Sequence, residues 1–135
     1  MKLFTDYLLT VVIMLGLDGL WLGVIAKEFN KKHLGSLMRD KILVLPAILF
    51  YLIYAAALLY FVINPGMENK NVAKLVMSGA FLGVVCYATF DLTGLSILNN
   101  WSVKLTVIDI LWGALMTGLT AFLVYMVSSL LKVTL

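Results

Sequence analysis

The sequence predicts an all-α integral membrane protein, a four-helix transmembrane bundle with short loops that forms a single domain over residues 1–135. Hydrophobic residues make up 63% of the chain, whereas charged residues make up only 13%. A soluble domain of this length would be about a quarter charged, because most of its surface faces water. The apolar residues also fall into four long runs, each of which is long enough to cross a bilayer.

Each of these four runs provides the ~20 residues that a helix needs to cross about 30 Å of hydrocarbon. Lipid offers no hydrogen-bond partners, so the backbone of such a run must pair within itself, which predicts helices. Pro46 falls in the first turns of the second span, where its missing N–H costs little, and Asn64-Pro65-Gly66 is expected to end that span. The expected spans are residues 3–26, 42–63, 72–98 and 103–130.

The sequence does not indicate a cleaved signal peptide, an intrachain disulfide, a metal site or a nucleic-acid partner. The first span is longer than the apolar core of a signal peptide and contains Asp18, which favours a retained helix. The single cysteine, Cys86, excludes an intrachain disulfide, and the single histidine, His33, has no second His or Cys beside it to complete a metal site. The net charge of +3 is too small and too scattered for a nucleic-acid partner. No cofactor is indicated.

The orientation of the chain follows from its basic residues. Five of the 10 lysines and arginines lie in residues 27–41, the connection between the first two spans. Lysine and arginine accumulate in cytoplasmic loops. The sequence therefore predicts that this connection is cytoplasmic and that both termini are external.

Small residues recur four positions apart on three of the spans, and such stripes let helices approach closely in lipid. The stripes are Gly19 and Gly23, Gly79 and Gly83, and Ala114 and Gly118. The pattern leaves open whether they contact helices of the same chain or of a second copy. A homodimer is therefore expected as a partner in addition to the bilayer.

Three aspartates inside the spans are the main candidates for function. Asp18 lies 8 residues before the end of the first span, Asp91 lies 7 before the end of the third, and Asp109 lies 6 after the start of the fourth. At 1.5 Å per residue, all three lie roughly 9–12 Å below the same membrane face. A carboxylate at this depth is costly, so it normally faces the bundle interior or a wet cavity. We therefore expect the three side chains to converge on one internal pocket near residues 27–41.

Each aspartate has an aromatic residue on its own helical face, three or four positions away. These pairs are Asp18 with Trp21, Asp91 with Tyr87, and Asp109 with Trp112. Tyr87 is close enough along its helix to donate a hydrogen bond to Asp91. Trp101, in the short third loop, is expected to anchor the chain at the membrane interface.

Two roles remain open for the aspartates. Buried Asp side chains can bond neighbouring helices, each bond contributing about 0.6–2 kcal/mol. Alternatively, the pocket holds an ion, a proton or a polar head group. Three ionised carboxylates in one low-dielectric pocket would repel one another, so at least one should carry a proton or a cation should be present.

Longer motifs around these residues resemble a known family. They are the segments 18–23 (DGLWLG), 50–56 (FYLIYAA), 87–95 (YATFDLTGL), 100–101 (NW) and 109–113 (DILWG). Together they resemble the bacterial family of predicted membrane proteins known as domain of unknown function 2177. Phe90 and Gly94 depart from the family pattern, which has Tyr and Asn at these positions. The resemblance implies four helices and a bacterial inner (plasma) membrane, but no established activity.

The favoured function is a small oligomeric transporter or channel for an ion, a proton or a small polar solute. Four helices rarely enclose a pathway, so transport would require a dimer or larger assembly. The alternative is a lipid-binding or lipid-modification accessory protein. An intramembrane aspartyl enzyme is less favoured, because Gly16-Leu17-Asp18 lacks the Gly-x-Gly-Asp context, and no other catalytic residues are indicated.

Overall fold

A computed structural model describes residues 2–38, 40–41 and 43–134, and shows an all-helical bundle. Within the described residues there is no strand, and four helices are long and apolar enough to cross a membrane. The predicted fold class is therefore confirmed. The four candidate spans are Lys2–Ile25, Val44–Asn69, Val72–Ile97 and Val103–Leu131.

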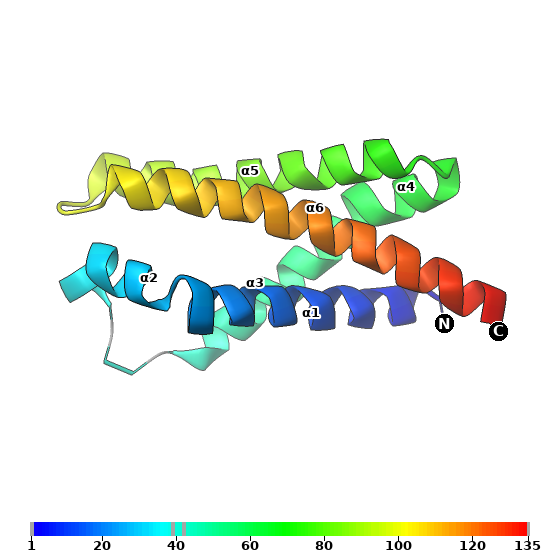
Figure 1. The fold of residues 1–135 in the computed structure, drawn as a ribbon, viewed down its shortest axis with the longest axis horizontal. Coiled ribbons are helices and arrows are strands. Elements are labelled where there is room, and N and C mark those ends of the chain that lie inside the picture. Colours follow the sequence, from blue (N-terminus) through cyan, green and yellow to red (C-terminus); the bar gives the residue numbers. More distant parts are fainter. Residues whose placement is uncertain (1, 39, 42, 135) are drawn as a thin grey trace.

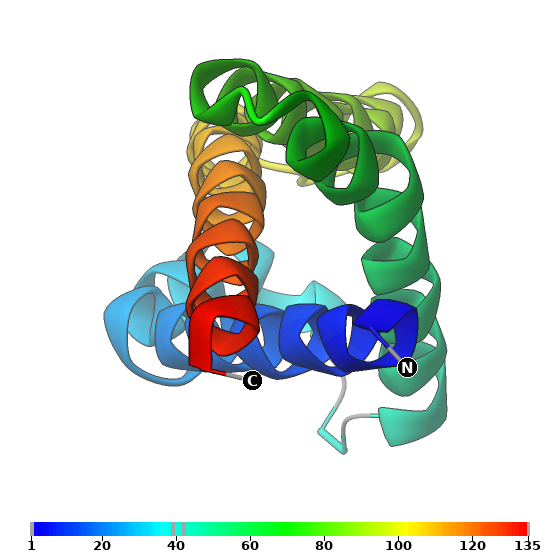
Figure 2. The same ribbon diagram turned by 90° about the vertical axis from the view of Figure 1, so that its right-hand side faces the viewer.

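The chain runs back and forth along one long axis. Figure 1 shows both termini at one end of the bundle, with α2 and the α5–α6 turn at the other end. Viewed along this axis, α1, α3, α5 and α6 form the four sides of the bundle (Figure 2). The elements are α1 (Lys2–Leu20), the π-helical η1 (Trp21–Ile25), α2 (Lys27–Leu34), the 3-10 helix η2 (Gly35–Leu37), α3 (Val44–Leu58), the π-helical η3 (Leu59–Ile63), α4 (Asn64–Asn69), α5 (Val72–Ile97) and α6 (Val103–Thr134).

The predicted end of the second span at Asn64-Pro65-Gly66 is wrong, because the helix continues through α4 to Asn69. The wider π-helical turns of η3 directly precede Pro65, which has no N–H to donate to a carbonyl of the preceding turn, and the helix continues past it. Gly66 packs against the start of α5, where a Cβ would lie 2.8 Å from the Cβ of Leu75. The turn to α5 follows at Lys70, which adopts the left-handed conformation.

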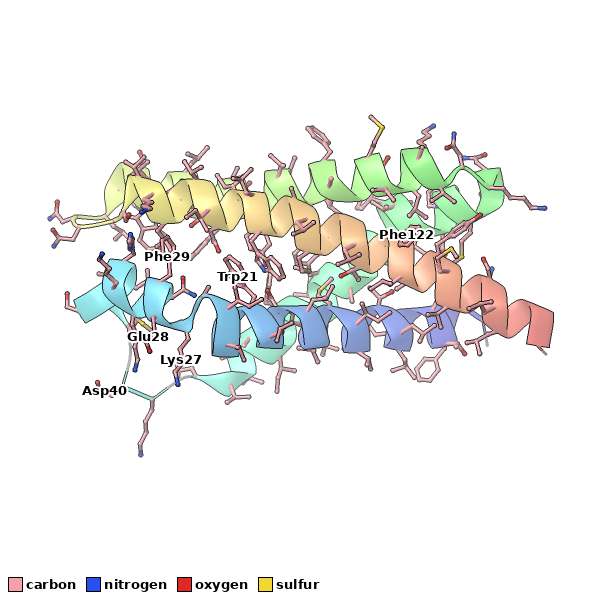
Figure 3. All side chains as sticks on the ribbon, in the orientation of Figure 1. Trp21, Lys27, Glu28, Phe29, Asp40 and Phe122 are labelled. Carbon is pink, nitrogen blue, oxygen red and sulfur yellow. The ribbon has the colours of Figure 1, made fainter. Side chains whose placement is uncertain are left out.

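The connection at residues 27–41 is not a plain loop, since it contains the short helix α2. Glu28 in its first turn and basic residues in its last turn both favour the helix dipole. Figure 3 shows Phe29 extending toward α6, while Lys27 and Glu28 point away from the bundle. The Phe29 ring stacks on His33, with 4.2 Å between ring centroids. The helix thus presents an aromatic face to the bundle and a charged face outward.

The half of the bundle near the termini is tightly packed. Its fully buried apolar side chains come from all four spans: Met14, Leu58, Ile63, Leu75, Met116 and Val124. Within this region the hydroxyls of Tyr54 and Thr117 are hydrogen-bonded at 2.6 Å. This pairing satisfies two polar groups that lipid or an apolar core would leave unpaired.

Glycines bring α5 and α6 into close contact. A Cβ at Gly79 would lie 3.2 Å from the Cα of Gly118, and a Cβ at Gly83 would overlap the backbone of Gly113. The small-residue stripes of the third and fourth spans therefore pack within the chain. On α1, by contrast, a Cβ at Gly19 would meet no atom within 4 Å among the residues described.

Candidate functional site

A cavity of ≈ 540 Å³ lies in the half of the bundle that carries α2. It lies at the end of the molecule where residues 27–41 connect the first two spans. All six residues that the sequence predicts for the site line it: Asp18, Trp21, Tyr87, Asp91, Asp109 and Trp112. The structure thus brings side chains from η1, α1, α5 and α6 together, and what they bind stays a prediction.

Asp18 joins three helices through its carboxylate. Its Oδ1 accepts a hydrogen bond of 2.8 Å from the Trp112 indole Nε1, and its Oδ2 accepts one from the Tyr51 hydroxyl. The side chain is only 4% exposed. Because both oxygens have donors from the protein, Asp18 is held in place as part of the framework. Sequence reasoning missed Tyr51, since no spacing along the chain connects α3 with Asp18.

Two tryptophans form one wall of the cavity. The rings of Trp21 and Trp112 stack with 4.5 Å between centroids and 5° between planes. Trp21 is the first residue of η1 and points from it toward α6 (Figure 3), and its carbonyl accepts the π-type bond from Ala26 N at 2.7 Å. Such π-helical turns are rare and occur frequently at functional sites. The buried Trp21 Nε1 has no acceptor in the described part of the chain.

Asp91 differs sharply from Asp18. It is 1% exposed, yet neither of its oxygens receives a hydrogen bond from an N–H or O–H of the described residues. The Asp109 carboxyl group also lines the cavity and interacts electrostatically with Asp91, but two carboxyl groups can share a hydrogen bond only if one carries a proton. A shared proton would still leave one Asp91 oxygen without a donor. Asp91 is therefore the unsatisfied group of the cavity.

The predicted hydrogen bond from Tyr87 to Asp91 is wrong, since both oxygens of Asp91 lack a donor among the residues described. The Tyr87 ring instead packs across to α6, where a Cβ at Gly113 would overlap it. It also lies near Tyr54 of α3, with 6.4 Å between ring centroids. Packing against neighbouring helices thus directs the ring away from the residue one turn along its own helix.

Trp101, expected to act as an interface anchor, is turned inward and lines the cavity. Its Nε1 donates to the Thr106 hydroxyl at 3.1 Å, and its ring lies over Gly94, where a Cβ would be 3.1 Å from the indole. It also meets the Phe90 ring edge to face at 5.5 Å. The third loop therefore helps to close the end of the cavity.

The lining combines carboxyl groups with aromatic faces. All three tryptophans of the sequence line the cavity, whereas no Lys, Arg or His is found among its described lining residues. Carboxylates and aromatic faces both attract cations. The described residues nevertheless hold no group of three or more His, Cys, Asp or Glu that could bind a metal ion.

Comparison with known proteins places the chain in a family. The model of the family described as "Predicted membrane protein (DUF2177)" matches residues 3–126, so the chain belongs to this family. No curated protein and no solved structure matches the sequence.

Proposed function

We propose that this member of the domain of unknown function 2177 family is a small membrane carrier that binds a cationic group in exchange for a proton. The observation behind this proposal is Asp91, whose two buried oxygens have no donor among the described residues although the side chain lines a cavity. A carboxyl group there is stable only when it holds a proton or faces a cation. The site can therefore alternate between these two partners.

The three aspartates have different roles in this proposal. Asp91 and Asp109 form the exchangeable pair: a proton between them is released when a cation takes its place. Asp18 already has two protein donors, so it supports the aromatic wall rather than the ligand. This division is consistent with carboxylates in membrane proteins that mark ion and proton pathways.

Transport requires more than this one cavity. The half near the termini is closed by the packed core around Leu58, Ile63 and Met116, so the ligand cannot cross without a rearrangement. At Gly19 of α1 and Gly23 of η1 a Cβ would meet no atom within 4 Å among the described residues, and a second copy packed on this face would supply further helices for such a change. The proposed carrier is accordingly a homodimer in a bacterial inner membrane.

The proposed function is tested by proton release. In weakly buffered lipid nanodiscs, adding butylammonium or dodecylammonium should release protons as the ammonium group displaces the proton of the Asp91–Asp109 pair. Asp91→Asn and Asp109→Asn should abolish the release, because an amide cannot take part in the exchange. Glu68→Gln, an exposed site on α4, is the matched control and should behave like the natural protein. If neither ammonium ion releases protons in an Asp91-dependent way, the proposed function is wrong.

A lipid-binding accessory role is the second candidate, favoured by the apolar and aromatic character of most lining residues. The two roles differ in whether the ligand crosses the bilayer. In proteoliposomes, a carrier should move dodecylammonium between leaflets faster in the natural protein than in Asp91→Asn. Binding with proton release but without any protein-dependent movement would favour the accessory role.

The side on which the cavity opens is a separate proposal. Five of 10 basic residues lie in residues 27–41, so the end of the bundle with α2 should face the cytoplasm. A cysteine introduced by Lys32→Cys in a Cys86→Ala background should resist an impermeant thiol reagent in intact cells. Rapid labelling there would place the cavity on the external side.

A further inference from the structure

Building on the proposed carrier function, we infer that the ligand is an amphiphile with one protonated amine and an apolar tail. We further infer that it reaches the cavity from the bilayer, through a lateral gap between α3 and α5. Both parts rest on side chains that line the cavity.

The gap follows from how α3 and α5 separate. They are close where Tyr54 and Tyr87 meet, with 6.4 Å between ring centroids. At the end with α2, the start of α3 lies on the side of the bundle away from α5 (Figures 1 and 2). Three of the described lining residues are exposed: Leu22 of η1 (51%), Phe50 of α3 (44%) and Phe90 of α5 (63%). Phe50 and Phe90 belong to the two helices that separate, so we place the opening between these helices.

The opening lies at the depth of the carboxyl groups rather than at the membrane surface. Phe90 immediately precedes Asp91, and Phe50 immediately precedes Tyr51, which donates to Asp18. The carboxyl groups are roughly 9–12 Å below the membrane face, so the outside at this level is hydrocarbon. A ligand that passes between the two phenylalanines therefore comes from the lipid.

The head group follows from the unsatisfied Asp91. Its oxygens need donors, no basic side chain is among the described lining residues, and no metal-binding group is present in the part of the chain described. A protonated amine supplies both N–H donors and the positive charge. The outer faces of the stacked Trp21 and Trp112 rings also attract an ammonium group, with the strongest effect where water is excluded.

The tail follows from the size and walls of the cavity. A volume of ≈ 540 Å³ lies within the usual range for small-molecule sites. Apart from the carboxyl groups and the aromatic rings, the lining includes apolar residues such as Leu22, Leu105 and Cys86. A small hydrophilic cation would leave these walls in contact with water, whereas an alkyl tail covers them. A tail longer than the cavity can continue through the gap into lipid.

The three tryptophans of the chain provide a direct readout, because all of them line the cavity. In nanodiscs made with brominated phosphatidylcholine, lipid tails that reach into the gap quench their fluorescence. An unbrominated ligand that displaces these tails should restore it. Dodecylammonium should do so saturably at a few mole per cent of the lipid. Butylammonium and dodecanol, which lack the tail and the charge respectively, should act at least about tenfold more weakly, and Asp91→Asn should lower the dodecylammonium affinity by a similar factor.

The route is tested by matched variants in stopped-flow measurements of dodecylammonium binding. Phe90→Ala widens the gap and should raise the association rate about threefold. Phe81→Ala removes an equally exposed ring from α5 that does not line the cavity, and should change nothing. Leu34→Ala would instead widen the α2 end of the cavity, and should change the association rate less than Phe90→Ala does.

Two results would overturn the inference while leaving the proposed function standing: equal affinities for butylammonium and dodecylammonium, or a rate that responds more to Leu34→Ala than to Phe90→Ala. An equal effect of dodecanol would contradict the cationic head group and with it the proposed function. The absence of any Asp91-dependent ammonium binding would also remove the proposed function itself.

Discussion

The two halves of the bundle use the same four spans in different ways. Near the termini, apolar side chains from all four spans interlock, and the hydroxyls of Tyr54 and Thr117 satisfy each other. Near α2, α3 separates from α5, and a cavity holds an aspartate without a donor in the described part of the chain. Stability and binding are thus concentrated at different depths. Substitutions in the two halves should therefore differ in size and even in sign.

The largest expected effect is at the contact between α5 and α6. Gly83→Val would drive its side chain into the Gly113 backbone, which cannot move aside, and should lower the free energy of unfolding by about 3 kcal/mol or more. Gly19→Ala is the control, because a Cβ there meets nothing within 4 Å among the described residues and should leave stability unchanged. Reversible unfolding in mixed micelles measures both. A mild effect of Gly83→Val would mean that the two helices are not in close contact.

The next effect concerns the framework aspartate. Asp18→Leu leaves the Tyr51 hydroxyl and the Trp112 N–H without their acceptor, and should cost about 2–3 kcal/mol of stability. Asp18→Asn keeps one acceptor oxygen and should cost less. The same unfolding assay gives the comparison. Equal stability of Asp18→Leu and the natural protein would show that these hydrogen bonds do not support the fold.

Asp91 should respond in the opposite direction. Asp91→Leu removes a buried group whose oxygens have no donor in the described residues, so it should raise stability by about 1–2 kcal/mol while ligand binding is lost. This opposite sign is what separates a binding carboxylate from a packing one. A loss of stability as large as that of Asp18→Leu would assign Asp91 to packing.

A smaller effect is expected in the packed half. Thr117→Val removes the hydroxyl partner of Tyr54 at nearly constant volume and should cost about 1 kcal/mol. Ammonium binding should be unaffected, because Thr117 does not line the cavity. Measuring unfolding and tryptophan fluorescence on the same samples tests both statements. A change in affinity would show that the two halves are coupled.

The smallest effect on the fold is expected on the free face of α1. Gly19→Leu should leave monomer stability within about 0.5 kcal/mol of the natural protein, since the position is exposed. It should nevertheless disrupt a homodimer that packs on this face. Mass measurement in nanodiscs across dilution is the test. A monomer at every concentration of the natural protein would contradict the proposed dimer.

Much of the fold could be predicted, because the length of the apolar runs is enough to identify membrane spans. The shared depth of Asp18, Asp91 and Asp109 likewise follows from counting residues, and the structure does bring them to one cavity. The continuation of helix past Pro65 and the helix α2 were missed, because a π-helical turn and a short amphipathic segment leave little trace in hydropathy.

Partners from distant parts of the chain were harder to predict. Tyr51 lies 33 residues from Asp18, and its hydrogen bond depends on how α3 crosses α1. For Tyr87, the spacing within one helix predicted Asp91 as its partner. The ring packs against α6 instead, because Gly113 has no side chain to occupy that space. Periodicity shows which residues share a face of one helix, whereas the crossing of helices decides which of them meet.

The depth of the carboxyl groups also determines how the membrane potential acts on the site. At roughly 9–12 Å into about 30 Å of hydrocarbon, a bound charge lies about a third of the way across the field. Moving one charge across the whole membrane is worth about 2.3 kcal/mol per 100 mV, so a cation that bound alone would gain or lose about 0.8 kcal/mol. If each cation displaces a proton from Asp91 and Asp109, no net charge enters the field. Binding at this site would then be insensitive to voltage, whichever way the bundle is oriented.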